Sequence, residues 1–135
     1  MMDALPDWPE GTVTVLSTGA GAPHAIPVSA AIRRGPREIA LALALPRESL
    51  VRLREDPRCA VTVLARGVAI TVHGAATVER ELERIAVVRV DVDSIQDHGS
   101  PRFEIDAGVQ WHWTSDEAAR GDAETRSALV RRDDE

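Results

Sequence analysis

The sequence predicts a mainly β protein, an antiparallel barrel of six to seven strands with short helices. Apolar and polar residues alternate with a period of two through much of the chain, most clearly over residues 88–93. Turns containing glycine or proline separate these segments at short intervals. Only residues 46–57 and 116–135 have a helix-like composition. Regular short strands with tight turns are typical of a closed barrel or a sandwich, and closure removes exposed sheet edges.

The first part of the chain predicts a meander of three strands. Residues 12–18 are rich in β-branched side chains and are expected to form a strand, and residues 19–23 have the glycines and proline of a turn. A second strand is expected from His24 to about Arg33, and a tight turn leads from it into a third strand over residues 38–45. The third strand is apolar enough to be buried on both faces.

The most distinct helix is predicted for residues 46–57. Pro46 suits the first turn of a helix, and Leu50 and Leu53 lie on one face of it. Pro57 ends the segment because the residue before a proline avoids helical angles. We expect a short helix that packs its leucines against the sheet.

Two further strands, residues 59–65 and 68–78, are predicted to form a hairpin around a turn at Arg66 and Gly67. Gly74 interrupts the second of these strands, which indicates either a bulge or the close approach of a ligand or backbone. Residues 79–84 are charged and are expected to form a helical turn.

The last part of the chain predicts two more strands and a terminal helix. Residues 88–93 alternate valines with charged side chains, and residues 109–113 place Val109, Trp111 and Trp113 on one face. Residues 116–135 are polar and helix-prone, with leucine and valine at positions 129 and 130 as expected docking residues.

Length and charge limit the class of protein. A chain of 135 residues favours one domain, with residues 1–10 and 120–135 peripheral. No stretch approaches the roughly 20 apolar residues of a membrane span. The first ten residues lack the pattern of a secretory signal, so we expect a cytoplasmic protein. A net charge of −6 argues against a nucleic-acid partner.

The residue types present exclude several chemistries. All 16 basic residues are arginines and there is no tyrosine, so lysine Schiff bases and tyrosine acid catalysis are excluded. Cys59 lies in an apolar run and is interpreted as a core side chain. The four histidines lack metal-ligand spacing, and we expect no metal site; a site of His112 with Asp91 and Asp93 is the weaker reading. No glycine-rich phosphate loop or serine nucleophile elbow is present.

Three segments in order resemble the pyridoxamine 5′-phosphate oxidase-like family, the FMN-binding split barrels. Residues 15–18 and 23–28 resemble the family's strand, glycine turn and proline-histidine step into a second strand. Residues 47–58 resemble its helix, which ends in Asp-Pro-Arg before an apolar strand. Residues 69–78 are similar to the strand whose glycine is followed by a small or basic residue. The resemblance covers roughly residues 11–78.

The resemblance implies a six-stranded, dimeric barrel with two equivalent cofactor sites between the subunits. It also implies that the flavin phosphate is held at the start of the short helix, here by Arg47 and Ser49, with Arg52 or Arg54 assisting. A helix start has unpaired N–H groups and the positive end of the helix dipole, which suit an anion. Members that bind FMN usually have a lysine where this chain has Ser49. The resemblance implies FMN as the cofactor, and the serine in place of lysine leaves a 5-deazaflavin coenzyme or haem as alternatives.

The resemblance also places the isoalloxazine ring along the second and third strands. In this chain, those positions are Pro27, Val28, Ser29, Leu43 and Ala44. Gly74 is interpreted either as a bulge or as a cofactor-side glycine. Trp111 or Trp113 of a second subunit could cover the ring, because indoles supply flat apolar area. Both are also read as core or dimer-interface residues.

The function that follows from this resemblance is that of an oxidoreductase whose cofactor carries the redox chemistry. Hydride would pass between the ring and a small organic substrate. No side chain is a strong candidate acid or base, so catalytic residues stay unassigned. Two alternatives remain open: a non-catalytic flavin- or haem-binding carrier of the same fold, and a cofactor-free dimeric interaction module.

Overall fold

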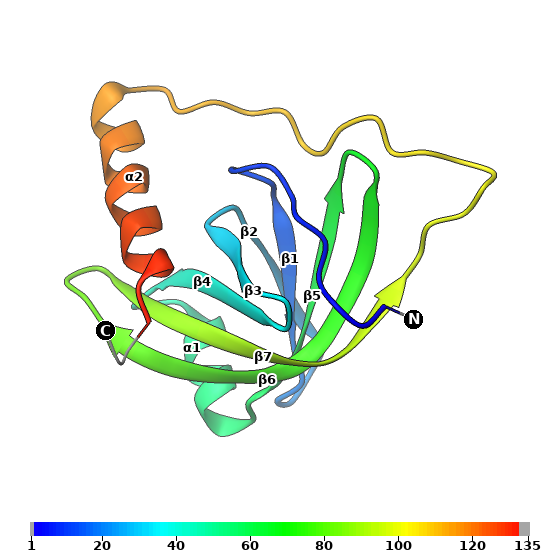
Figure 1. The fold of residues 1–135 in the computed structure, drawn as a ribbon. Coiled ribbons are helices and arrows are strands. Elements are labelled where there is room, and N and C mark those ends of the chain that lie inside the picture. The colour runs from blue at the N-terminus through cyan, green and yellow to red at the C-terminus, as the bar shows by residue number, and fades with distance from the viewer. Residues whose placement is uncertain (1, 133–135) are drawn as a thin grey trace.

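The computed structural model of the chain describes residues 2–132, which form seven strands and two helices (Figure 1). The strands are β1 (Thr14–Thr18), β2 (His24–Val28), β3 (Ala31–Gly35), β4 (Glu38–Ala44), β5 (Arg58–Ala65), β6 (Val68–Glu81) and β7 (Ile85–Asp97). The helices are α1 (Glu48–Glu55) and α2 (Asp116–Val130). The predicted fold class is confirmed: a mainly β, antiparallel barrel with short helices.

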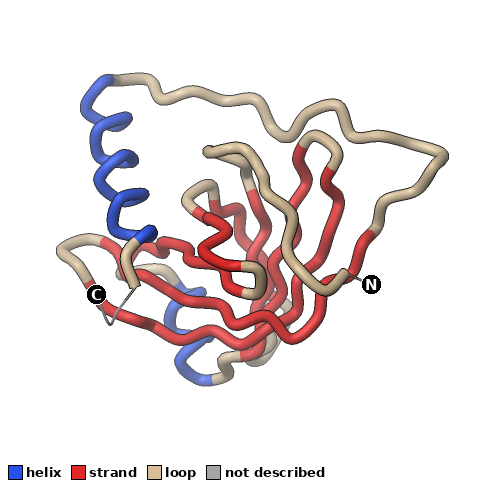
Figure 2. Tube along the Cα trace, viewed as in Figure 1, coloured by secondary structure: helices blue, strands red, loops and turns tan. Residues whose placement is uncertain are grey.

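The strands form one antiparallel sheet in the order β2-β1-β5-β6-β7-β4-β3. β2 and β3 lie at opposite edges of this sheet, yet only Ser29 and Ala30 separate them in the chain. The two edges are therefore held together, and the sheet has to curl into the barrel that Figure 2 shows. The β5-β6-β7 meander forms its long curved wall (Figure 1).

The barrel interior is filled by the inward-facing residues of nearly every strand. Leu16, Leu41, Val61, Val72 and Ile95 are completely buried, and each comes from a different strand. Leu50 and Leu53 of α1 pack into the same cluster and close one end of the barrel. Burying one such side chain stabilises a fold by about 1.5–3 kcal/mol. The predicted leucine face of the short helix is confirmed.

Helix α2 docks on the outside of the sheet through its last turns. Ala128 and Leu129 pack against Ala40 and Val87. Arg34 of β3 donates to the carbonyl oxygen of Leu129 at 3.3 Å, so an arginine lies at the negative end of the helix. The expected docking of residue 129 is confirmed, whereas Val130 is 63% exposed and does not dock.

The expected final strand over residues 109–113 is wrong. Residues 98–115 form an extended arm that runs from β7 to α2 without joining the sheet (Figure 2). β7 already pairs with β6 on one side and β4 on the other. The two outer strands, β2 and β3, are the remaining edges of the sheet, and the arm pairs with neither of them.

Two local expectations also need correction. Residues 79–81 continue β6 instead of forming a helical turn, because the Glu79 side chain accepts hydrogen bonds from Arg34 of β3 and Arg89 of β7. The expected single strand from His24 to Arg33 is interrupted at residues 29–30, where the chain crosses between the two sheet edges. Helix α1 itself begins at Glu48, two residues after Pro46.

Within residues 2–132, neither helix has the length and apolar character that crossing a membrane requires.

Candidate functional site

The first region of interest is the start of α1, which follows β4 directly. Arg47 is the N-cap residue, with extended backbone angles of φ −68° and ψ 135°. Its N–H group donates to the carbonyl oxygen of Ala44 at 3.0 Å, which fixes the turn from strand to helix. The Arg47 side chain is exposed and makes no hydrogen bond or ion pair within residues 2–132. It therefore faces solvent and makes no contact with the rest of the described chain that fixes it.

Ser49 lies behind Arg47 and is 1% exposed. Its hydroxyl group is 3.1 Å from Nε2 of His24, the first residue of β2. The other ring nitrogen of His24, Nδ1, lies 3.3 Å from the carboxylate of Glu48. These contacts join the helix start to β2 and give His24 a structural role.

Arg52 joins the same helix to the turn between β1 and β2. Its Nη1 atom donates to the carbonyl oxygens of Ala20 and Ala22, and its Nη2 atom lies 3.6 Å from the carboxylate of Glu48. Its Nε atom is buried and has no partner within the described chain. Arg52 is thus mainly a clamp between α1 and the β1–β2 turn, with one buried donor that has no partner in the described chain.

The predicted ring-binding residues occupy the ends of β2 and β4. Leu43 is buried in the core, and Ala44 leads into the α1 start. Pro27 is exposed on the edge strand, and Val28 is buried, with its carbonyl oxygen accepting from the hydroxyl of Thr14 at 2.8 Å. Ser29 is half-buried at the far end of β2 from His24. The predicted residues therefore follow β2 away from the helix start.

Gly74 lies at a β-bulge where the register between β6 and β7 shifts. A Cβ atom at this position would come within 2.3 Å of the carbonyl oxygen of Asp91. The close approach of β7 therefore accounts for this glycine, and the bulge reading of the sequence is confirmed.

The two arm tryptophans lie together, away from α1. Trp111 and Trp113 form an edge-to-face pair with ring centroids 5.0 Å apart and an interplanar angle of 88°. The indole N–H of Trp111 donates to the carbonyl oxygen of Gly11 at 2.8 Å, which holds the arm against the N-terminal segment. They are 36% and 42% exposed, so neither is a core residue.

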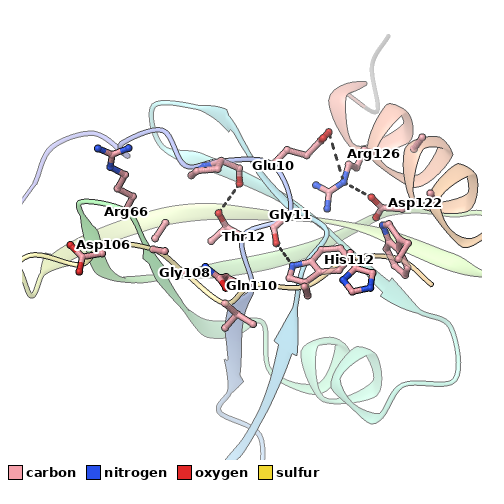
Figure 3. A pocket seen from close by; sticks show the side chains of 18 residues that line it. Glu10, Gly11, Thr12, Arg66, Asp106, Gly108, Gln110, His112, Asp122 and Arg126 are labelled. Carbon is pink, nitrogen blue, oxygen red and sulfur yellow. Dashed lines mark hydrogen bonds and ion pairs between the residues drawn. The ribbon is translucent and has the colours of Figure 1, made fainter. Parts of the chain in front are cut away.

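Both tryptophans line an open cavity of about 770 Å³ between the arm, the N-terminal segment, the β5–β6 hairpin and α2. Figure 3 shows Arg126 beside Glu10 and Asp122 at one end of this cavity, and Arg66 with Asp106 at the other. Arg126 has no distinctive signal in the sequence, because an arginine four residues after an aspartate on a polar helix is the pattern of an ordinary surface ion pair.

A third feature is the outer face of the sheet. Two rows of outward-facing residues cross five neighbouring strands in register. The outer face consists of Ala25, Ser17, Ala60, His73 and Ser94 in one row and Pro27, Val15, Thr62, Thr71 and Gln96 in the other. None of the ten is an aspartate, glutamate or arginine, although charged residues make up 28% of the chain.

The one thiol of the chain is not part of any of these features. Burial, and to a smaller extent the charge of Asp93, raises the pKa of Cys59 to about 12. The thiol is therefore protonated at neutral pH, which disfavours a nucleophilic role. Within residues 2–132, no three histidine, cysteine or acidic side chains gather in a metal-binding arrangement.

Together, the sheet order, the short helix after β4 and the long β6–β7 hairpin define a split barrel, the fold of pyridoxamine 5′-phosphate oxidase-like proteins. No protein-family model matches the chain, and no curated protein matches its sequence. The likeness to this family is therefore established in three dimensions and not from sequence identity.

Solved structures of this fold match much of the chain. A proposed pyridoxamine 5′-phosphate oxidase from Listeria innocua is 15% identical, with a TM-score of 0.56 over 66% of this chain and 90% of that one. BorF, the flavin reductase component of a bacterial two-component tryptophan halogenase, is 14% identical, with a TM-score of 0.57 over 67% and 81%. HupZ of Group A Streptococcus is 12% identical, with a TM-score of 0.56 over 75% and 90%.

Proposed function

We propose that the chain is a flavin- or deazaflavin-dependent oxidoreductase that works as a homodimer, with the cofactor bound between the subunits. The observation that carries this proposal is the start of α1. Arg47 is exposed there, has no partner in residues 2–132, and stands next to the first N–H groups of the helix, which no side chain caps. Similar structures include a flavin reductase component and an FAD-binding protein from Mesorhizobium loti, which supports a flavin as the ligand class.

The residues at the α1 start suit the anionic tail of such a cofactor. The first N–H groups of a helix point outward and carry the positive end of its dipole. Arg47 adds a planar donor fork that matches phosphate oxygens. The unpartnered Nε atom of Arg52 supplies a further donor close by. Because Ser49 is already bonded to His24, we assign the direct phosphate contact to Arg47 and give Ser49 a supporting role.

The carboxylate of Glu48 repels a phosphate at the start of α1. Its carboxylate lies in the first turn of α1 and contacts both His24 and Arg52. A second negative charge at this point raises the cost of binding a doubly charged phosphate. Binding at this site should therefore be weaker than at a site with a lysine at position 49.

The chain's own residues would bind, orient and shield the cofactor. In this proposal Pro27, Val28 and Ser29 border the ring along β2, and Ala44 provides apolar surface at the end of β4. Leu43 is 2% exposed, so it packs in the core and supports the site from behind. Trp111 or Trp113 of a second copy could cover the ring from the other side. When bound, the cofactor supplies hydride transfer to or from a small organic substrate. No side chain of the site is assigned as an acid or base.

The outer face supports the homodimer. The two rows across five strands contain no aspartate, glutamate or arginine, and depletion of charged residues is a feature of the core of a protein interface. The same face includes Pro27, which lies on the strand assigned to the ring. A second copy on this face would place its own residues next to the cofactor.

The proposal is tested by titrating purified protein with FMN, with riboflavin and with a 5-deazaflavin coenzyme, following flavin fluorescence. Riboflavin is FMN without its phosphate, so it separates binding of the ring from binding of the tail. Replacing Arg47→Ala should weaken FMN binding about tenfold, near 1.4 kcal/mol, and leave riboflavin unchanged. Arg54 lies at the other end of α1 and pairs with Glu81, so it does not assist at the helix start as expected from the resemblance. Arg54→Ala is therefore the matched control and should change neither.

If none of the three compounds gives a saturable change in flavin fluorescence, the proposal is contradicted. Equal losses for FMN and riboflavin in Arg47→Ala contradict the assignment of the phosphate to the helix start.

A second function, that of a non-catalytic flavin or haem carrier, is favoured by one observation. The position that usually holds a lysine is a buried serine already bonded to His24, next to the carboxylate of Glu48. A site of this kind binds the tail less firmly. Visible absorption distinguishes these cases, because haem gives a Soret band and a flavin gives a doublet. Turnover assays with a bound flavin then separate carrier from enzyme.

A further inference from the structure

The cavity under the arm has the size and walls of a small-molecule site. Its volume of about 770 Å³ lies within the range of ligand pockets. Trp111 and Trp113 supply flat apolar surface on the side of the arm. Gly11 has a φ of +83°, and a Cβ atom there would lie 3.3 Å from the Trp111 ring. The glycine thus allows the indole to lie directly on the N-terminal segment.

Helix α2 turns a distinct face toward this cavity. Ala119, Asp122, Ala123 and Arg126 all line it, and their spacing of three and four residues puts them on one stripe of the helix. The alanines leave space where larger side chains would fill the cavity. The helix therefore uses its last turns to dock on the sheet and its earlier turns to form a wall.

Arg126 is the polar group of this wall with an unmet hydrogen-bonding need. Its side chain is 9% exposed. Its Nε atom donates to Asp122 at 2.7 Å and its Nη2 atom donates to the carbonyl oxygen of Ser29 at 3.0 Å. Its Nη1 atom is buried and has no partner within the described residues. A buried donor without an acceptor costs about 1–3 kcal/mol, which a ligand oxygen would recover.

The charges around the cavity decide whether this ligand oxygen belongs to an anionic or a neutral group. The charged residues of the lining are three carboxylates and two guanidinium groups, namely Glu10, Asp106, Asp122, Arg66 and Arg126. Asp122 already pairs with Arg126, and Glu10 lies 3.9 Å from its Nε atom. An anionic ligand would meet an excess of negative charge. A neutral carbonyl oxygen that accepts from Nη1 avoids this repulsion.

We propose that the cavity binds an uncharged, planar heteroaromatic molecule with a carboxamide group. The amide oxygen accepts from Nη1 of Arg126, the amide N–H groups face the carboxylates of Asp122 and Glu10, and the ring lies against Trp111 and Trp113. The cavity lies away from the α1 start, and although its two tryptophans are also the proposed ring cover, the inference does not rest on the cofactor and is tested without it.

The smallest probe of this class is nicotinamide, and nicotinate is its anionic counterpart with the same ring. Cofactor-free, ¹⁵N-labelled protein gives one indole N–H signal for each of its three tryptophans. Nicotinamide should shift the signals of Trp111 and Trp113 saturably and leave that of Trp8, which is outside the lining, unchanged. Nicotinate should bind at least fivefold more weakly.

A matched pair of variants on α2 locates the site. Ala123→Leu fills part of the cavity while Arg126 and both tryptophans stay in the chain, and it should reduce nicotinamide affinity at least tenfold. Ser127→Leu puts the same side chain on an exposed part of the helix outside the lining and should change nothing.

Three outcomes overturn the proposal: no saturable shift, equal effects of the two leucine variants, or nicotinate binding as tightly as nicotinamide. Because no flavin is present, a negative result here leaves the flavin titration unaffected. Failure of that titration likewise leaves this test intact.

Discussion

Cys59 shows how burial decides the chemistry of a single residue. Because the folded-state pKa is raised from 9.0 to about 12, the folded protein keeps its proton at pH values where the unfolded chain loses it. The thiol's contribution to stability is complete below pH 9 and is lost as the pH rises toward 12. At pH 8, we expect Cys59 to react with a thiol reagent far more slowly in native protein than in unfolded protein.

An engineered cysteine at the exposed Thr77 position of β6 provides the control for this measurement and should react rapidly in the native state. Fast labelling of native Cys59 would mean that the core around it is open.

Replacing glycine by alanine should have opposite effects on stability at positions 74 and 121. Gly74→Ala would push a methyl group against the Asp91 carbonyl oxygen and should destabilise the fold by about 1–3 kcal/mol. Gly121 lies within α2, and a Cβ atom there meets nothing within 4 Å. Gly121→Ala should therefore stabilise the protein by about 0.5–1 kcal/mol. Urea unfolding followed by circular dichroism measures both, and changes of equal sign would contradict the account.

At the level of elements, a buried ion pair connects the sheet to α2. Glu79 has a side chain that is 1% exposed, and it accepts from both Nη atoms of Arg34 at 2.9 and 2.6 Å. Arg34 in turn donates to the carbonyl oxygens of Leu129 and Arg131 at the end of the helix. Removing the Glu79 charge leaves a buried arginine without its main partner, which is more costly than losing a surface pair.

Glu79→Gln should therefore destabilise the protein by about 3 kcal/mol and increase hydrogen exchange in α2. Glu81→Gln is the matched control on the same strand. Its partner Arg54 and Glu81 itself are each half exposed, so the loss should stay below about 1 kcal/mol. Similar losses for the two variants would show that the buried pair does not hold the helix.

The same network has a pH dependence of known sign. Burial disfavours the charged form of Glu38, but hydrogen bonds from Arg34 and Arg132 outweigh it and hold the pKa of Glu38 below its ordinary value of 4.5. The stabilisation is therefore present above pH 4.5 and is lost as the pH falls through the lowered pKa.

The elements also show what the sequence could and could not reveal. The short helix, the β5–β6 hairpin and the valine strand follow from local patterns, because each pattern has one stable solution. The exposed arm does not, because the alternation of Val109, Trp111 and Trp113 is the same in a paired strand and in an extended segment. Which of the two forms depends on whether a sheet edge is open, and that is a property of the whole barrel.

At the scale of the whole molecule, the candidate sites were predictable only where they are local. The start of α1 follows from a helix signal with an arginine before it. The cavity brings together segments near residues 10, 66, 110 and 123, so no window of sequence contains it. The outer face is equally non-local, because its uncharged rows appear only when the register of five strands is known.

The central claim is that two copies of the barrel hold a flavin between their outer faces. Sedimentation velocity with FMN, recorded at both the protein band and the visible flavin band, tests it in one experiment. We predict one boundary with the mass of a dimer that carries the bound flavin. Ala60→Arg, which places a charge in the middle of the outer face, should yield a monomer with much weaker flavin binding. Wild-type protein that sediments as a monomer, or flavin that sediments only as free dye, would contradict the account.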